Sequence, residues 1–398
     1  MLFQTLDNKR ECLGYYANNE LHYHEIPLSA DKTWYYSPSL KDRHVEYARI
    51  YSGGMTLTEA CPEELKSGWD SVTNRLRSFL KSFQTAKINL NETCIYNLIP
   101  EFFLYELCDA KNKITEHILT TRQRPLNHDF VVDVVKMLAD IKEQPLNIDT
   151  EPIMTKLVSV KGKNFVKRLQ KNERVCDYNP FGTVTGRLTT NPKTFPILTL
   201  HRDFRGCLHP QNDWFLELDY NAAEVRTLLG LSGIDQPTGD IHQWNIQNIY
   251  DGKMDRPQAK RKIFEWLYSD KQNKKAEAFY DKNLVKEKYW DGSNIHTEFG
   301  RDIKGVDNHH ALSYIVQSTT SDLVLNKAVE IHEWLREKES AIAFMMHDSI
   351  VIDLKYEERQ MIPELMKIFG TTPFGDYKVN VALGKNFGDM KDLNINGA

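Results

Sequence analysis

An acidic triplet interrupts one of the most apolar stretches of the chain. Residues 341–354 read AIAFMMHDSIVIDL, with His347, Asp348 and Ser349 at the centre. An ionised carboxylate is costly to bury unless another group compensates its charge. The two apolar runs predict a strand pair with the triplet at its tip. Asp348 is therefore either a functional acid or the partner of a buried Arg.

A second acid has a comparable position. Residues 214–218 predict a strand, so Asp219 lies at the end of a buried strand, and Asn221 can cap the helix that follows. Two carboxylates held together resist ionisation unless a divalent cation offsets their charge. Mg²⁺ suits this task, because it binds one or two carboxylates and keeps its other positions for water and phosphates. The alternative is two unrelated acids in the core or on the surface.

The composition indicates an ordinary globular protein. The chain has 398 residues, 41% of them hydrophobic, and its formal net charge is −4, which argues against coating nucleic acid by bulk electrostatics. Two basic segments, 156–174 and 256–262, are solvated helix faces or local anion sites. Six cysteines without a CxxC pair suggest neither a zinc ribbon nor a disulfide framework. Without a targeting segment or an apolar span, we expect a cytoplasmic protein with no membrane partner.

Helical periodicity predicts several further elements. An apolar stripe over residues 71–141 indicates a helical layer, whereas residues 1–84 are mostly aperiodic. Helices are also expected over three later segments: 256–268, 276–288 and 312–338.

The segment RPQAKRKIFEWLY aligns two cations and two aromatic side chains. Arg256, Lys260, Phe264 and Tyr268 recur every fourth residue and share one stripe of a helix. The cations can bind a triphosphate while the aromatics face a base and a sugar. The alternative is an amphipathic helix with its aromatics in the core.

Three segments resemble, in order, motifs A, B and C of the family A DNA polymerases, the bacterial DNA polymerase I type. They are DYNAAEVR at 219–226, RPQAKRKIFEWLY at 256–268 and MHDS at 346–349. Five flanking segments are similar to further elements of that family: TGRL at 185–188, DIHQ at 240–243, TEFGR at 297–301, QSTTSDL at 317–323 and VNVALGKNFGDM at 379–390. Each segment alone is weak evidence, but the ordered set is specific.

The resemblance implies an α+β protein with the right-hand polymerase fold. It would have a palm built on an antiparallel sheet, a helical thumb and helical fingers. The implied domains are an N-terminal region of unknown role (1–84), a thumb (85–175), a palm in two parts (176–231 and 300–398) and fingers (232–299). The implied reaction adds deoxynucleoside 5′-triphosphates to a primer 3′-hydroxyl opposite a DNA template, with two Mg²⁺ ions and release of pyrophosphate.

The resemblance also implies roles for individual residues. Asp219 and Asp348 would be the catalytic acids and would bind metal together with the Tyr220 carbonyl. Nucleotide binding falls to His242, Arg256, Lys260, Phe264, Tyr268 and Glu224. DNA contacts fall to Arg187, Gln317, Arg301 and His347. Glu224 would exclude a ribose 2′-hydroxyl, and it also fits a capping box with Asn221.

Some positions depart from the family pattern. Ser349 stands where motif C usually has Glu, Ala222 where motif A has Gln or a similar polar residue, and Ser269 where a Gly follows the motif B Tyr. These changes concern fidelity and speed more than the reaction type. The interval from Tyr268 to Phe299 is short for the family and implies trimmed fingers.

The expected partners are primer-template DNA and dNTP. The DTE at residues 149–151 lies too close to TGRL to begin a 3′–5′ exonuclease domain, so we expect none in this chain. A separate exonuclease or processivity subunit is a further candidate partner, with residues 1–84 as a docking region. A compact polymerase of this kind suits a virus and then the host cytoplasm.

Two alternatives remain. A single-chain RNA polymerase shares the two acids and Lys260, but Glu224 with Phe264 and Tyr268 favours deoxynucleotides. A catalytically inactive, polymerase-like DNA-binding subunit is suggested only by Ser349.

Overall fold

The computed structural model describes residues 1–398 except 8–13, 24, 91–92, 172–173, 270–271 and 394–398. The chain divides into two compact units, Met1–Lys136 and Met137–Ala398. The helix α5 (His128–Lys142) contains the boundary between them. The domain boundaries inferred from the sequence stay predictions.

The first unit combines a small sheet with long helices. β1 (Phe3–Thr5), β2 (Tyr15–Ala17) and β3 (Glu20–His22) form an antiparallel sheet. α3 (Glu63–Thr85) and α4 (Glu101–Thr121) bury the predicted apolar stripe in a core that includes Trp69 and Phe103. α3 begins ahead of the expected residue 71, because acids in its first turn favour the positive end of the helix dipole.

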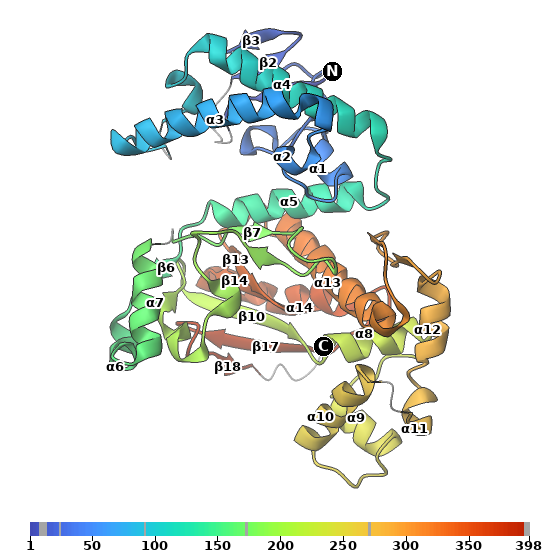
Figure 1. Cartoon of the computed structure of the whole chain (residues 1–398). Coiled ribbons are helices and arrows are strands. Elements are labelled where there is room, and N and C mark those ends of the chain that lie inside the picture. The colour runs from blue at the N-terminus through green and yellow to red at the C-terminus, as the bar shows by residue number, and fades with distance from the viewer. Residues whose placement is uncertain (8–13, 24, 91–92, 172–173, 270–271, 394–398) are drawn as a thin grey trace. The chain divides into compact units, whose positions relative to one another are not determined.

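A five-stranded antiparallel sheet forms the centre of the second unit (Figure 1). Its strand order is β13 (Ala341–Met346), β14 (Ser349–Leu354), β10 (Trp214–Tyr220), β17 (Val379–Gly384) and β18 (Lys391–Asp392). All four pairings are antiparallel. The predicted antiparallel sheet is confirmed, as are the strand at 214–218 and the strand pair at 341–354. His347 and Asp348 form the two-residue turn between β13 and β14.

The central strand β10 has two different faces. The Tyr220 ring stacks on Phe369 of α14 (Ile362–Gly370), with 4.1 Å between centroids. Side chains alternate along a strand, so Glu217 and Asp219 lie on the opposite face. Both are partly exposed, whereas Leu218 between them is fully buried. The sheet therefore presents its acids on the face turned away from α14.

A helical lobe follows β10 (Figure 1). It comprises α8 (Ala223–Leu231), α9 (Ile241–Asn248), α10 (Arg256–Leu267), α11 (Lys274–Glu277) and α12 (Lys282–Tyr289). These helices share an apolar core with the long helix α13 (Asn308–Trp334). The single helix predicted over 276–288 is wrong: Asp281 accepts hydrogen bonds from the amides of Asn283 and Leu284, and this cap begins a second helix.

The basic segment at 156–174 forms two short helices, α6 (Met154–Leu157) and α7 (Val160–Lys171). Phe165 anchors α7 by stacking on Phe204 at 4.8 Å between centroids. The basic side chains of α7 are exposed. The exposed basic face of α7 agrees with the solvated helix face expected for this segment, and a local anion site there stays a prediction.

Two further expectations have different outcomes. In the described part of the chain, no helix has the length and apolar character needed to cross a membrane. The sequence suggests no disulfide framework; Cys94 is disulfide-bonded, whereas Cys61, Cys108, Cys176 and Cys207 are free thiols.

Candidate active site

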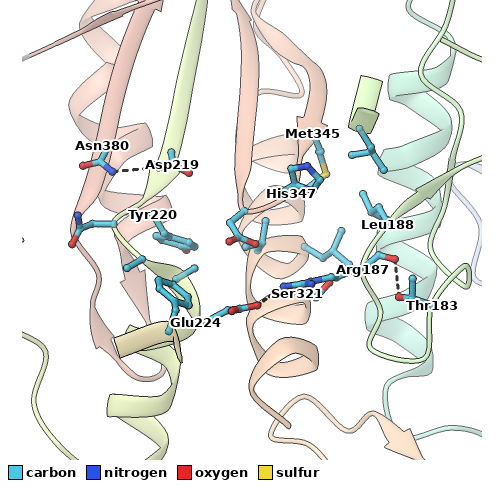
Figure 2. Close-up of a pocket in the computed structure, with 18 of the residues that line it drawn as sticks. Thr183, Arg187, Leu188, Asp219, Tyr220, Glu224, Ser321, Met345, His347 and Asn380 are labelled. Carbon is cyan, nitrogen blue, oxygen red and sulfur yellow. Dashed lines mark hydrogen bonds and ion pairs between the residues drawn. The ribbon is translucent and has the colours of Figure 1, made fainter. Parts of the chain in front are cut away.

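A cavity of about 800 Å³ opens at the acidic end of β10. Its walls include the β13–β14 turn, α8, α9, α10, α13 and the loop before β8 (Thr189–Thr190). Figure 2 shows part of this wall, with Glu224 of α8, Ser321 of α13 and Arg187 of the loop. It brings together ten of the residues singled out in the sequence: Arg187, Asp219, Tyr220, Glu224, His242, Arg256, Lys260, Phe264, His347 and Asp348. Tyr268, Gln317 and Arg301 do not line it.

Asp219 lies near the end of β10, and Asp348 lies in the turn that leads into the adjacent strand β14. Asp219 pairs in register with Ser349 of β14, so Asp348 is the direct neighbour of that partner. On the other side of β10, Asn380 of β17 is the register partner of Asp219 and donates to its Oδ2 at 3.2 Å. Figure 2 shows this bond at the cavity wall. The sheet therefore fixes both carboxylates at one edge of the cavity.

Both acids resist ionisation. Burial is the main reason why the pKa of Asp219 is raised to about 6, and the charges of Glu217 and Asp348 act in the same direction. The bond from Asn380 and the charge of Lys260 lower it. Burial also raises the pKa of Asp348. A cation bound nearby would lower the pKa of both carboxylates and so favour their ionised form.

The donor set fits a divalent cation bound with help from substrate. Among the described residues, no three Asp, Glu, His or Cys side chains gather into a metal cluster of their own. Asp219 and Asp348 supply carboxylate oxygens, and the remaining ligands would be the Tyr220 carbonyl, water and phosphate. Mg²⁺ is commonly bound in this manner, through one or two carboxylates and substrate oxygens.

The helix α10 forms a cationic wall. Arg256, Lys260 and Phe264 line the cavity from successive turns, which confirms the predicted helix and places three of the four stripe residues on one face, while Tyr268 lies at the C-cap and does not line the cavity. Asp255 caps α10 by accepting from the Gln258 amide. Arg256 donates from Nη2 to Asp240 Oδ2 at 2.6 Å, a pairing that helps to hold the pKa of Asp240 well below its usual range although burial opposes it.

His242 lies near the start of α9, where it is 2% exposed. Burial lowers its pKa to about 4, and the charges of Arg256 and Lys260 contribute. Its Nδ1 is buried and has no hydrogen-bond partner among the described residues. His242 is therefore a neutral imidazole that lines the cavity and carries one buried ring nitrogen without a partner among the described residues.

Glu224, in the first turn of α8, connects two other segments. It accepts hydrogen bonds from the Tyr268 hydroxyl and from the Arg187 guanidinium, the latter visible in Figure 2. Burial raises the pKa of Glu224, whereas both partners lower it. Gln317 lies against the Tyr268 hydroxyl and lowers its pKa. Tyr268 thus contacts the cavity residue Glu224, and Gln317 contacts Tyr268.

The capping-box interpretation of Glu224 is wrong. The residue before α8 is Ala222, in the left-handed region at φ 58°, and its side chain makes no cap. Asn221 instead donates to Asp240 at 2.9 Å and accepts from the Ile241 amide at 2.9 Å. Asn221 therefore ties the end of β10 to the start of α9, and Glu224 turns toward Tyr268 and Arg187.

Arg301 lies in a buried ion pair. Its Nε and Nη2 donate to the two oxygens of Asp322 at 2.8 and 2.6 Å, and the Asp322 side chain is fully buried. Gly186 of the TGRL segment, at φ 77°, packs so closely on the guanidinium that a Cβ there would overlap it. Three of the predicted segments thus meet at one ion pair beside the Arg187 loop. A DNA contact by Arg301 stays a prediction.

Sequence reasoning missed three polar residues near the site: Asn380, Asp322 and Glu217. Asn380 and Asp322 lie within segments of the resemblance, but neither was distinguished there. Asn380 is placed beside Asp219 by the register between β10 and β17, and Asp322 of α13 is placed by its ion pair with Arg301. Neither relationship is visible along the chain.

Comparison with known proteins identifies the fold. No family model and no curated protein matches the chain. The fold is nevertheless that of a polymerase domain. Among solved structures, the chain is similar to the POL domain of Pol1 from M. smegmatis in complex with DNA primer-template and dNTP, with a TM-score of 0.60 and 11% sequence identity over 87% of this chain and 82% of that one. This similarity supports the polymerase type of fold inferred from the sequence, whereas the division into palm, thumb and fingers and the viral source stay predictions.

Proposed function

We propose that this chain is a template-directed DNA polymerase that adds deoxynucleoside 5′-triphosphates to a primer 3′-hydroxyl. The observation that carries the proposal is the convergence of Asp219, Asp348, Arg256 and Lys260 on one cavity of a polymerase fold. The similar POL domain was solved with primer-template and dNTP, which supports the same substrates here.

Asp219 and Asp348 would hold the two Mg²⁺ ions, with the Tyr220 carbonyl as a further ligand. When bound, such ions activate an attacking hydroxyl and stabilise charge on a leaving pyrophosphate. The chain contributes rigidity, because Asp219 belongs to β10 and Asp348 to the tight turn that leads into its neighbour β14, and the hydrogen bonds between these two strands hold the turn beside Asp219. Asn380 orients Asp219 through its side-chain amide.

The wall formed by α9 and α10 suits a triphosphate. Arg256 and Lys260 face the cavity one helical turn apart, where both can donate to phosphate oxygens. His242, a neutral imidazole, lines the same cavity. Phe264, whose ring centroid lies 6.3 Å from that of His242, supplies an apolar surface for the base and sugar.

Glu224 supports the choice of sugar. Its carboxylate lines the cavity and is held there by Tyr268 and Arg187, so a ribose 2′-hydroxyl would have to enter an already occupied, buried contact. This favours deoxynucleotides over the RNA polymerase alternative. The two acids and the cations of α10 together disfavour an inactive DNA-binding subunit.

We assign the five-stranded sheet to the palm, residues 232–299 to the fingers and residues 85–175 to the thumb. The exposed basic face of α7 supports duplex binding through phosphates, which would weaken as salt rises. The proposal includes no 3′–5′ exonuclease in this chain, and a separate exonuclease or processivity subunit remains a candidate partner.

Primer extension with Mg²⁺ tests the proposal. Asp219→Asn and Asp348→Asn should each reduce the rate at least about a hundredfold, the order seen when one preorganised electrostatic contact is removed. Asp376→Asn, at an exposed acid of the same unit, is the matched control and should keep parental activity. Full extension by both active-site variants would refute the proposed function.

A further inference from the structure

A third acid lies beside the two proposed metal ligands. Glu217 is two residues before Asp219 and shares its face of β10. Ser349, the register partner of Asp219, donates its hydroxyl to Glu217 Oε1 at 3.1 Å and lies equally close to the Met346 carbonyl. The contact crosses from β14 to β10 directly behind the two acids.

The identity of Ser349 makes this contact significant. Motif C of the family that the chain resembles usually has Glu at this position, and Ser349 is only 4% exposed and carries no charge. Glu217 brings a carboxylate to the same place from the neighbouring strand. The negative charge that Ser349 cannot provide is therefore present on β10, two register pairs from the Asp219–Ser349 pair.

We propose that Glu217 is a positioning residue for the divalent cations at Asp219 and Asp348, acting through the Ser349 hydroxyl and through its own charge. This inference rests on the proposed function. Glu217 does not line the cavity, and among the described residues the acids form no cation site by themselves, so Glu217 is not a direct ligand. Carboxylates behind the direct ligands commonly orient those ligands and strengthen metal binding.

A purely structural role is the competing explanation. The positive charge of Arg205 lowers the pKa of Glu217, although burial raises it more. The Arg205 guanidinium also lies over the Phe387 ring, 4.8 Å from the centroid. If Glu217 only neutralised Arg205, its removal would change folding stability and leave cation affinity unaltered.

Titration of the full chain with Mn²⁺ in the presence of primer-template and a non-hydrolysable dNTP, followed by electron paramagnetic resonance, separates the two roles. Glu217→Gln keeps a hydrogen-bond acceptor for Ser349 and removes the charge, and it should weaken Mn²⁺ binding roughly tenfold. Moving the charge with Glu217→Ala and Ser349→Glu together should restore most of the affinity. Glu333→Gln, an exposed acid on α13, is the control and should bind like the parent.

An unchanged Mn²⁺ affinity in folded Glu217→Gln overturns the inference, and so does a folded relocation variant that restores none of the loss. If Glu217→Gln does not fold, the double variant is compared with its Glu217→Ala, Ser349→Gln counterpart, and equal affinities count against the proposal. Failure of the parent itself to bind Mn²⁺ and to extend a primer would refute the proposed function. If the parent binds Mn²⁺ and extends a primer, but Glu217→Gln binds Mn²⁺ as tightly as the parent, only the role of Glu217 is refuted.

Discussion

Replacing Asp322 by alanine removes one partner from a buried ion pair and should strongly destabilise the second unit. Asp322 is fully buried and the Arg301 side chain is only 16% exposed, with two hydrogen bonds of 2.8 and 2.6 Å between them. A guanidinium left buried without its carboxylate costs about 3–5 kcal/mol. For a unit of this size, that corresponds to a fall in Tm of roughly 6–20 °C.

The double variant Arg301→Met, Asp322→Leu tests the physical reason. Since most of the cost of a single change comes from the unpaired charge, removal of both charges should destabilise less than either single change. Arg336→Met disrupts an exposed pair with Glu333 near the end of α13 and should change stability by no more than about 0.5 kcal/mol.

Urea unfolding monitored by circular dichroism measures these differences. Because Gly186 packs on the Arg301 guanidinium, Asp322→Ala should also loosen the Arg187 loop and raise KM for primer-template. The reasoning is refuted if Asp322→Ala costs less than about 1 kcal/mol, or if the double variant costs as much as the two single changes combined.

Three further predictions follow from other contacts. Glu224→Ala should raise ribonucleotide relative to deoxynucleotide incorporation at least about tenfold in single-nucleotide assays, and an unchanged ratio would show that Glu224 does not select the sugar. The pKa of Asp240 is held low in the folded state, so its charge stabilises the fold above its unfolded pKa of about 4 and that contribution is lost as pH falls through the folded pKa. Asp240→Asn should therefore lower the free energy of unfolding by about 1–2 kcal/mol at pH 7, a value kept small because Arg256 is half exposed. In urea unfolding, the difference between variant and parent should shrink below pH 4. A difference that stays constant with pH contradicts the assignment. Phe165→Ala should cost about 3–5 kcal/mol by leaving a cavity under α7, and a loss below 1 kcal/mol in the same assay would mean that the ring is not an anchor.

The pattern of apolar and charged residues along the sequence predicted the strands and the helix that carry the site residues. Apolar runs located β10 and the β13–β14 hairpin, and fourth-residue spacing located α10 with Arg256 and Lys260. These elements follow from short-range rules because one face of each is buried. The ordered motifs then indicated which segments share the cavity.

Other features depend on contacts between distant segments and could not be predicted from pattern. Asn221 fits a helix cap, but tertiary bonds to Asp240 and the Ile241 amide replace that role. The partners of Asp219 and Ser349 depend on strand register, which joins residues at least 130 positions apart. The break before α12 arises from one Asp cap within an otherwise periodic run.

The most direct test of the account is the location of the cations. A crystal of the chain with primer-template, a non-hydrolysable dNTP and Mn²⁺ would reveal the metal by anomalous scattering. The account predicts Mn²⁺ between the carboxylates of Asp219 and Asp348, with the triphosphate extending toward Lys260. Metal bound elsewhere, or a triphosphate bound away from both acids, would contradict it.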